Sequence, residues 1–150
     1  MTTKVATVVE HMQSIAPLDY AAEWDNVGLM IGSTDWTADR VMLTIDLTDT
    51  VLQEAIDNDI NMIVSYHPPI FQPLTSLTDG DFKQRVALEA ARAGIAVYSP
   101  HTALDAAPDG VNDWLVKGLG DGDSRALRSH QDLPESEECK IATICPREGP

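Results

Sequence analysis

Short apolar runs alternate with helical patterns between residues 41 and 99, and this alternation constrains the fold more than any other feature of the chain. Runs rich in β-branched residues are expected to form strands at 41–47, 61–65 and 95–99. Helices are expected at 50–58, where Thr50 opens a capping-box spacing, and at 81–93, which Gly94 closes. This order predicts a mainly parallel sheet of the α/β class, with right-handed crossovers and flanking helices.

The segments on either side of this alternation extend the prediction. Five apolar residues share one helical stripe that Pro17 ends: Val5, Val8, Val9, Met12 and Ile15. A further helix is expected near Gly110, and a short strand at 140–145 would need pairing partners that nothing downstream provides. We therefore expect an α/β lobe over 1–120, followed over 121–150 by an acidic loop and the start of a further strand.

The charge of the chain limits its partners. The formal net charge is −14, from 24 acidic and 10 basic residues, which argues against direct nucleic-acid binding because that binding depends on Lys and Arg. No apolar stretch is long enough to cross a bilayer, and the N-terminus has no apolar secretory core, so we expect a cytoplasmic protein without membrane contact. Cys139 and Cys145 lack C-x-x-C spacing and are interpreted as reduced thiols.

Four residues that could bind a metal lie at or just beyond the ends of the predicted strands: Asp46, His67, His101 and Asp105. Since the carboxyl ends of parallel strands meet at one edge of a sheet, these side chains are expected to converge. Imidazole and carboxylate groups bind zinc, iron and manganese, and a bound cation can lower the pKa of water to about 7. The pattern favours a divalent-metal site suited to hydrolysis, and the long segment 67–80 beside it has the length of a binding loop.

Structural alternatives stay open for each of these residues. Asp46 could cap the following helix instead of facing a metal. His101 and Asp105, four positions apart, could form a hydrogen-bonded pair that stabilises their loop, with Asp105 capping the region of Gly110. His11 falls away from the centre of the apolar stripe of its helix and is interpreted as a solvent-facing residue outside the site.

Three motifs resemble the NIF-three-like family, also catalogued as GTP cyclohydrolase I type 2 homologues. They are Glu-Trp-Asp-Asn-Val-Gly-Leu at 23–29, Ser-Tyr-His-Pro-Pro-Ile-Phe at 65–71, and Tyr-Ser-Pro-His-Thr-Ala-Leu-Asp-Ala at 98–106 with Gly-Val-Asn at 110–112. The resemblance runs in order to about Gly120 and is closest to the eukaryotic branch. It implies the N-terminal lobe of an α/β protein with a dinuclear metal centre, often assembled into oligomers.

By this resemblance, His67 corresponds to the second histidine of a paired His-His ligand motif and Asp105 to a ligating aspartate. His101 is implied to lie beside these ligands, and we expect Tyr66 and Asp46 to lie beside them as well. Tyr66 stands where many members have the first histidine, and a phenol with a pKa of about 10 is a poor ligand at neutral pH. The remaining ligands of the family, a histidine and a glutamate on a C-terminal helix, have no counterpart here, and His130 lacks their motif.

Two functions follow from this incomplete set. The first is a metal-dependent, hydrolase-like protein acting on a nucleotide or another phosphorylated small molecule, with zinc, iron or manganese bound only weakly by this chain alone. The second is a non-catalytic interaction protein that binds a transcriptional regulator, which would add a nuclear location. Both allow self-association into a homo-oligomer, because an exposed apolar edge of the lobe would favour it.

Overall fold

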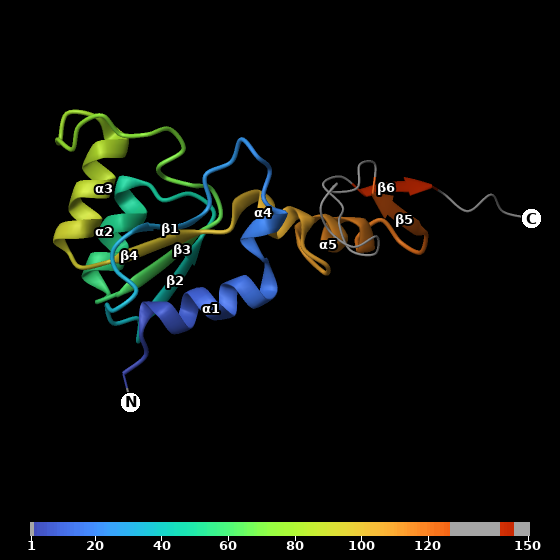
Figure 1. Cartoon of the computed structure of the whole chain (residues 1–150), viewed down its shortest axis with the longest axis horizontal. Helices are drawn as coiled ribbons and strands as arrows, with labels where there is room; N and C mark the ends of the chain where they lie inside the picture. Colours follow the sequence, from blue (N-terminus) through green and yellow to red (C-terminus); the bar gives the residue numbers. More distant parts are fainter. Residues whose placement is uncertain (1, 127–141, 146–150) are drawn as a thin grey trace, which may run out of the picture.

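A four-stranded sheet forms the centre of the protein in the computed structural model, which describes residues 2–126 and 142–145 (Figure 1). The strands are β1 (Gly28–Ile31), β2 (Val41–Thr44), β3 (Met62–Ser65) and β4 (Ala96–Ser99), and they lie in the order β1-β4-β3-β2. β2, β3 and β4 are parallel, whereas β1 pairs antiparallel with β4. The predicted α/β class and the mainly parallel sheet are confirmed.

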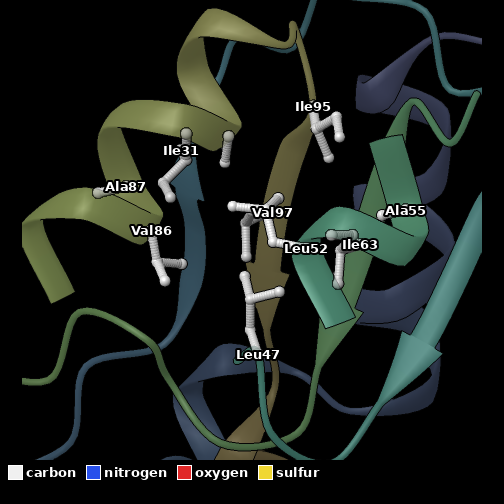
Figure 2. Close-up of a cluster of buried hydrophobic side chains, with 10 residues drawn as sticks. Ile31, Leu47, Leu52, Ala55, Ile63, Val86, Ala87, Ile95 and Val97 are labelled. Carbon is white, nitrogen blue, oxygen red and sulfur yellow. The ribbon is translucent and has the colours of Figure 1, made fainter. Parts of the chain in front are cut away.

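Two helices cover one face of this sheet, α2 (Asp49–Asp57) and α3 (Phe82–Arg92). Their buried side chains, Leu52 and Ala55 from α2 and Val86, Ala87 and Ala90 from α3, pack against Ile63 and Val97 of the sheet (Figure 2). The Thr48 hydroxyl caps α2 by accepting a hydrogen bond from the Val51 N–H at 3.2 Å. The cap expected at Thr50 is therefore wrong by two residues, because Thr48 still has extended backbone when the helix begins.

The opposite face is covered by α1 (Val5–Ile15), the predicted N-terminal helix, which is followed by the 3₁₀ turn η1 (Leu18–Tyr20). Val5 of this helix joins a buried cluster with Met62, Val64, Ala96 and Tyr98 of the sheet. Figure 1 shows the resulting layers, with α2 and α3 on one side of the sheet and α1 on the other. These three layers leave the carboxyl ends of β2, β3 and β4 open to the loops that carry the candidate site residues.

Some elements differ from the prediction. The strand expected at 41–47 ends at Thr44, and Leu47 beyond it is buried in the core rather than paired in the sheet. β1 was not predicted, since it is only four residues long and begins at Gly28, a residue type that is depleted in strands. The short helix α4 (His101–Ala106) was also missed, whereas α5 (Val111–Lys117) begins directly after Gly110 as expected.

The C-terminal part adds two paired strands, β5 (Asp123–Ala126) and β6 (Ala142–Cys145). β6 confirms the strand expected at 140–145, and its antiparallel partner β5 lies upstream, in a region that the sequence predicts to be loop. Figure 1 shows α5 and these strands extending away from the layered sheet. The division of the chain into a lobe over 1–120 and a separate part over 121–150 stays a prediction. His130, the acidic stretch 134–138 and Cys139 lie outside the described residues. No helix in the described part of the chain is long and apolar enough to cross a membrane.

Candidate functional site

Three pairs of polar side chains meet where the parallel strands end. His67 Nδ1 lies 2.8 Å from Asp46 Oδ1, the Tyr66 hydroxyl lies 2.5 Å from Asp105 Oδ1, and His101 Nδ1 lies 2.8 Å from Asp25 Oδ1. The loops after β2 and β3 supply the first pair, while the loop after β3 and helix α4 supply the second. The third pair joins α4 to the segment before β1. All the residues expected at this edge of the sheet therefore form side-chain hydrogen bonds there.

The pair of His67 and Asp46 fixes the tautomer of the imidazole. An ionised carboxylate only accepts hydrogen bonds, so Nδ1 of His67 is the donor, and in the neutral imidazole Nε2 then has the lone pair. Both side chains are about half exposed or more, at 48% for His67 and 65% for Asp46. Asp46 does not cap α2, because Thr48 is the N-cap, so that alternative is wrong.

The Tyr66 hydroxyl is hydrogen-bonded to the carboxylate of Asp105, which was expected to bind a metal. Burial raises the pKa of the Tyr66 hydroxyl, and the hydrogen bond to Asp105 together with the nearby negative charges raises it further. The phenol therefore stays protonated at neutral pH and donates to Asp105. The backbone carbonyl of Asp105 accepts a second bond, from Asn112 Nδ2 at 3.0 Å, which ties α4 to α5. Asp105 thus uses its carboxylate toward Tyr66 rather than to cap the region of Gly110.

Asp25 is a buried partner of His101 that sequence reasoning missed. Its side chain is fully buried and accepts from His101 Nδ1, the Asn26 N–H and both the N–H and the hydroxyl of Thr102. Burial alone would raise the pKa of Asp25, but the bonds from Thr102, His101 and Asn26 outweigh it and lower the pKa. His101 is bonded to Asp25 and Asp105 to Tyr66, so the alternative of a His101–Asp105 pair is wrong.

The backbone at His101 supports a specialised role for this residue. His101 has a φ of +33°, a left-handed conformation that is unfavourable for a side chain other than glycine. Such strain persists where the surrounding structure holds it, and it concentrates at functional sites. The only sequence signal for the Asp25 pair was that Asp25 lies within the first of the three family motifs.

The rings of the site touch one another around His101. The ring centroid of His101 lies 5.6 Å from that of His67 and 5.7 Å from that of Tyr66, and the Tyr66 and His67 rings are 4.9 Å apart. Tyr66 therefore lies beside both His67, through its ring, and Asp105, through its hydroxyl. The structure brings the candidate residues into one cluster, although their roles as metal ligands stay a prediction.

The donors of this cluster do not form a complete metal site. Within residues 2–122, whose side chains the structure describes, no three histidine, cysteine, aspartate or glutamate side chains are grouped so that they could hold one ion. Each carboxylate is instead paired with a different ring-bearing side chain: Asp46 with His67, Asp25 with His101, and Asp105 with Tyr66. Since catalytic zinc sites use three protein ligands, the side chains described here are not sufficient for one.

Comparison with known proteins identifies the family. A family model described as Duf34/NIF3 (NGG1p interacting factor 3) matches residues 3–147. NIF3-like protein 1 of Drosophila melanogaster is 45% identical over 117 residues, which are 77% of this chain and 40% of that protein. NGG1-interacting factor 3 of Saccharomyces cerevisiae is 44% identical over 129 residues, which are 79% of this chain and 45% of that protein. A Bacillus cereus protein related to NIF3 has a similar solved structure, with a TM-score of 0.79 and 30% identity over 86% of this chain and 36% of that one.

The chain spans less than half the length of these relatives. The match nevertheless covers the sheet, the helices around it and every residue of the candidate site. The resemblance that the three motifs indicated is therefore confirmed over most of the sequence, and the α/β fold agrees with that of the bacterial relative. The chain belongs to the Duf34/NIF3 family.

Proposed function

We propose that this lobe forms one wall of a divalent-metal centre in a hydrolase-like protein, with His67 and Asp105 as its ligands. The observation that carries this proposal is the 2.8 Å contact between His67 Nδ1 and Asp46. Histidines that bind metals commonly donate their second ring N–H to a carboxylate, which fixes the ring and makes the free nitrogen more basic. His67 has this arrangement, with Nε2 left to bind an ion.

The other ligands must come from outside the cluster described above. The chain spans 40% of the length of the fruit-fly relative, so a longer family member has ample sequence to supply them. With two ligands the lobe should bind metal weakly, and imidazole with carboxylate suits zinc, iron or manganese. A nucleotide or another phosphorylated small molecule is the proposed substrate, and the cytoplasm the proposed location.

Metal titration of single variants tests the proposal. Zn²⁺ or Mn²⁺ is titrated against a chelating dye in the presence of the intact chain, His67→Ala or Asp105→Ala, and retained metal is measured by elemental analysis. Both variants should lose metal, because each removes one of two ligands. His11→Ala is the matched control, since His11 is an exposed histidine on α1 whose ring is hydrogen-bonded to the Thr7 carbonyl of the same helix. Equal metal content in all four proteins would contradict the proposal.

An exposed apolar strip supports a second candidate function, the binding of a protein partner. Val41 and Leu43 of the edge strand β2 pair in register with Met62 and Val64, so they lie on the face of the sheet that α1 covers. α1 does not extend over them, and Leu43 is 77% exposed. Such strips on an edge strand favour association with another chain.

The partner we propose for this strip is a transcriptional regulator, and a second copy of the chain is the alternative. Binding to a transcriptional regulator would place the protein in the nucleus as well. The name of the yeast relative, NGG1-interacting factor 3, supports this choice. Sedimentation of the chain alone and with purified yeast NGG1p separates these partners. Leu43→Lys should abolish whichever association occurs, whereas Lys83→Ala, an exposed change on α3, should not. A chain that stays monomeric and does not bind NGG1p would contradict this function.

A further inference from the structure

Trp24 is an exposed aromatic residue beside the His101 cluster, and the proposed metal ligands give it no role. The residue is 67% exposed, although its ring centroid lies 6.3 Å from that of His101 and 6.1 Å from that of Phe71. Phe71 in turn lies 6.5 Å from His101, edge-on at 89°. The three rings therefore form an aromatic cluster next to His67 and Tyr66, in which Trp24 is the most exposed ring.

The backbone on both sides of Trp24 is held in place. The side chain of Asp25, the next residue, is buried and bonded to His101 and Thr102, and the Asp25 N–H donates to the Ala22 carbonyl at 2.9 Å. The Asn26 side-chain amide donates to the Ile70 carbonyl, so the segment carrying Trp24 is fastened to the segment carrying Phe71. An exposed ring on an anchored segment loses little conformational entropy when a ligand covers it.

The chemistry around this surface indicates what would bind. The side chains in contact beside it are aromatic, imidazole or carboxylate groups, and the carboxylates of Asp46 and Asp25 disfavour a phosphate there. An indole face stacks on flat rings, and base stacking on aromatic side chains tolerates many bases because each has a π-face. His67 and Asp46, both about half exposed or more, offer hydrogen-bonding groups for the edge of such a ring.

We propose that Trp24, with Phe71 and His101 behind it, is the subsite for the planar heteroaromatic base of the substrate. This inference rests on the proposed function, because it assigns the base of a nucleotide-like substrate to the surface beside His67 and Asp105. The stacked ring is recognised by its face, and any phosphate of the substrate lies away from this surface.

Titration with a nucleoside tests the subsite without metal. Inosine carries a purine and no phosphate, and the indole N–H signals of the three tryptophans can be followed separately by NMR. The Trp24 signal should shift and saturate, whereas the signal of Trp114, which is 71% exposed on α5, should stay unchanged. Ribose 5-phosphate, which has no base, should leave all three signals in place.

Variants then measure the contribution of the ring. Trp24→Ala should weaken inosine binding by about tenfold or more, followed on the ligand signals by saturation transfer, while Trp114→Ala should leave it unchanged. Equal inosine binding by Trp24→Ala, or a response to ribose 5-phosphate, would overturn the subsite. A response to tetramethylammonium would also overturn it, because this cation binds aromatic faces without having a flat ring. The metal content of Trp24→Ala should equal that of the unaltered chain. If His67→Ala loses metal but the unaltered chain does not bind inosine, the subsite is rejected and the metal site is kept. If the unaltered chain binds inosine but His67→Ala loses no metal, only the metal site is rejected.

Discussion

Tyr66 and Asp105 are joined by a 2.5 Å hydrogen bond between the end of β3 and helix α4. The bond occupies the carboxylate that the family resemblance assigns to metal binding, and its donor stands where the same resemblance places a histidine in many members. Because burial and the adjacent carboxylate raise the pKa of Tyr66, the phenol keeps its proton at neutral pH. This pair therefore holds Asp105 in a state in which one oxygen is bonded to a protein donor rather than to an ion.

Replacing Tyr66 should change metal affinity to different extents in two variants. Tyr66→His adds an imidazole beside His67 and removes the phenol from Asp105, so we expect metal to bind about tenfold more tightly or better. Tyr66→Phe removes the same hydroxyl without adding a ligand, and it serves as the matched control. Competition with a chelating dye gives both affinities. Equal affinities of the two variants would show that position 66 supplies no ligand.

The sequence predicts the parts of the fold that depend on periodicity. The strands and helices between residues 41 and 99 follow from regular apolar patterns, and the observed bounds of β3 and β4 agree with the expected ones to within one residue. β1 and α4 were missed because a segment of four or six residues contains too little of any period to be recognised. The end of β2 was placed too late because Leu47 is apolar for reasons of core packing, not of sheet pairing.

The candidate site could be predicted only in part, for a related reason. His67, His101 and Asp105 were found because each follows a predicted strand. Asp25 was missed because its partner His101 lies 76 positions away, and nothing in a single sequence indicates that pairing. The cluster is thus a product of tertiary contacts that the order of strands and helices does not specify.

Asp25 should stabilise the fold in a manner that depends on pH. Its pKa is lower in the folded protein than in the unfolded chain, so the unfolded chain binds more protons on acidification and stability falls. Asp25→Asn should cost about 1 to 3 kcal/mol at pH 7, because it removes the charge that four hydrogen bonds stabilise. The contribution is fully present above the unfolded pKa of about 3.9 and is lost as pH falls below it.

Urea unfolding at pH 7 and near pH 3 measures this difference in stability between the unaltered chain and Asp25→Asn. The difference should shrink at the lower pH, since Asp25 is then protonated in the unfolded chain and increasingly in the folded one. Glu10→Gln removes an exposed carboxylate on α1 and should show no comparable loss at pH 7. A difference that grows on acidification would contradict the assigned direction of the shift.

The hydroxyl of Tyr98 should be dispensable for stability. Tyr98 is fully buried, and its hydroxyl has no hydrogen-bond partner among the residues that the structure describes. Leaving a buried hydroxyl unpaired is unfavourable, so Tyr98→Phe should leave the free energy of unfolding unchanged or raise it by up to about 1 kcal/mol. Tyr66→Phe, which removes a bonded hydroxyl, should instead lower it by about 0.5 to 1.5 kcal/mol. A loss above about 1 kcal/mol in Tyr98→Phe would reveal a partner for this hydroxyl.

Gly110 should tolerate no side chain, because it lies where α4 turns into α5. A Cβ at this position would lie 2.1 Å from the Leu104 carbonyl oxygen and 2.6 Å from that of Ala107, so the backbone itself would have to move. Gly110→Ala should therefore destabilise the protein by about 1 to 3 kcal/mol or more. Because this junction positions the segment of Asp105, the variant should also weaken metal binding. Gly80→Ala is the control, since its nearest neighbour is the Thr78 hydroxyl at 3.9 Å. Equal urea midpoints for the two variants would show that the junction has room for a methyl group.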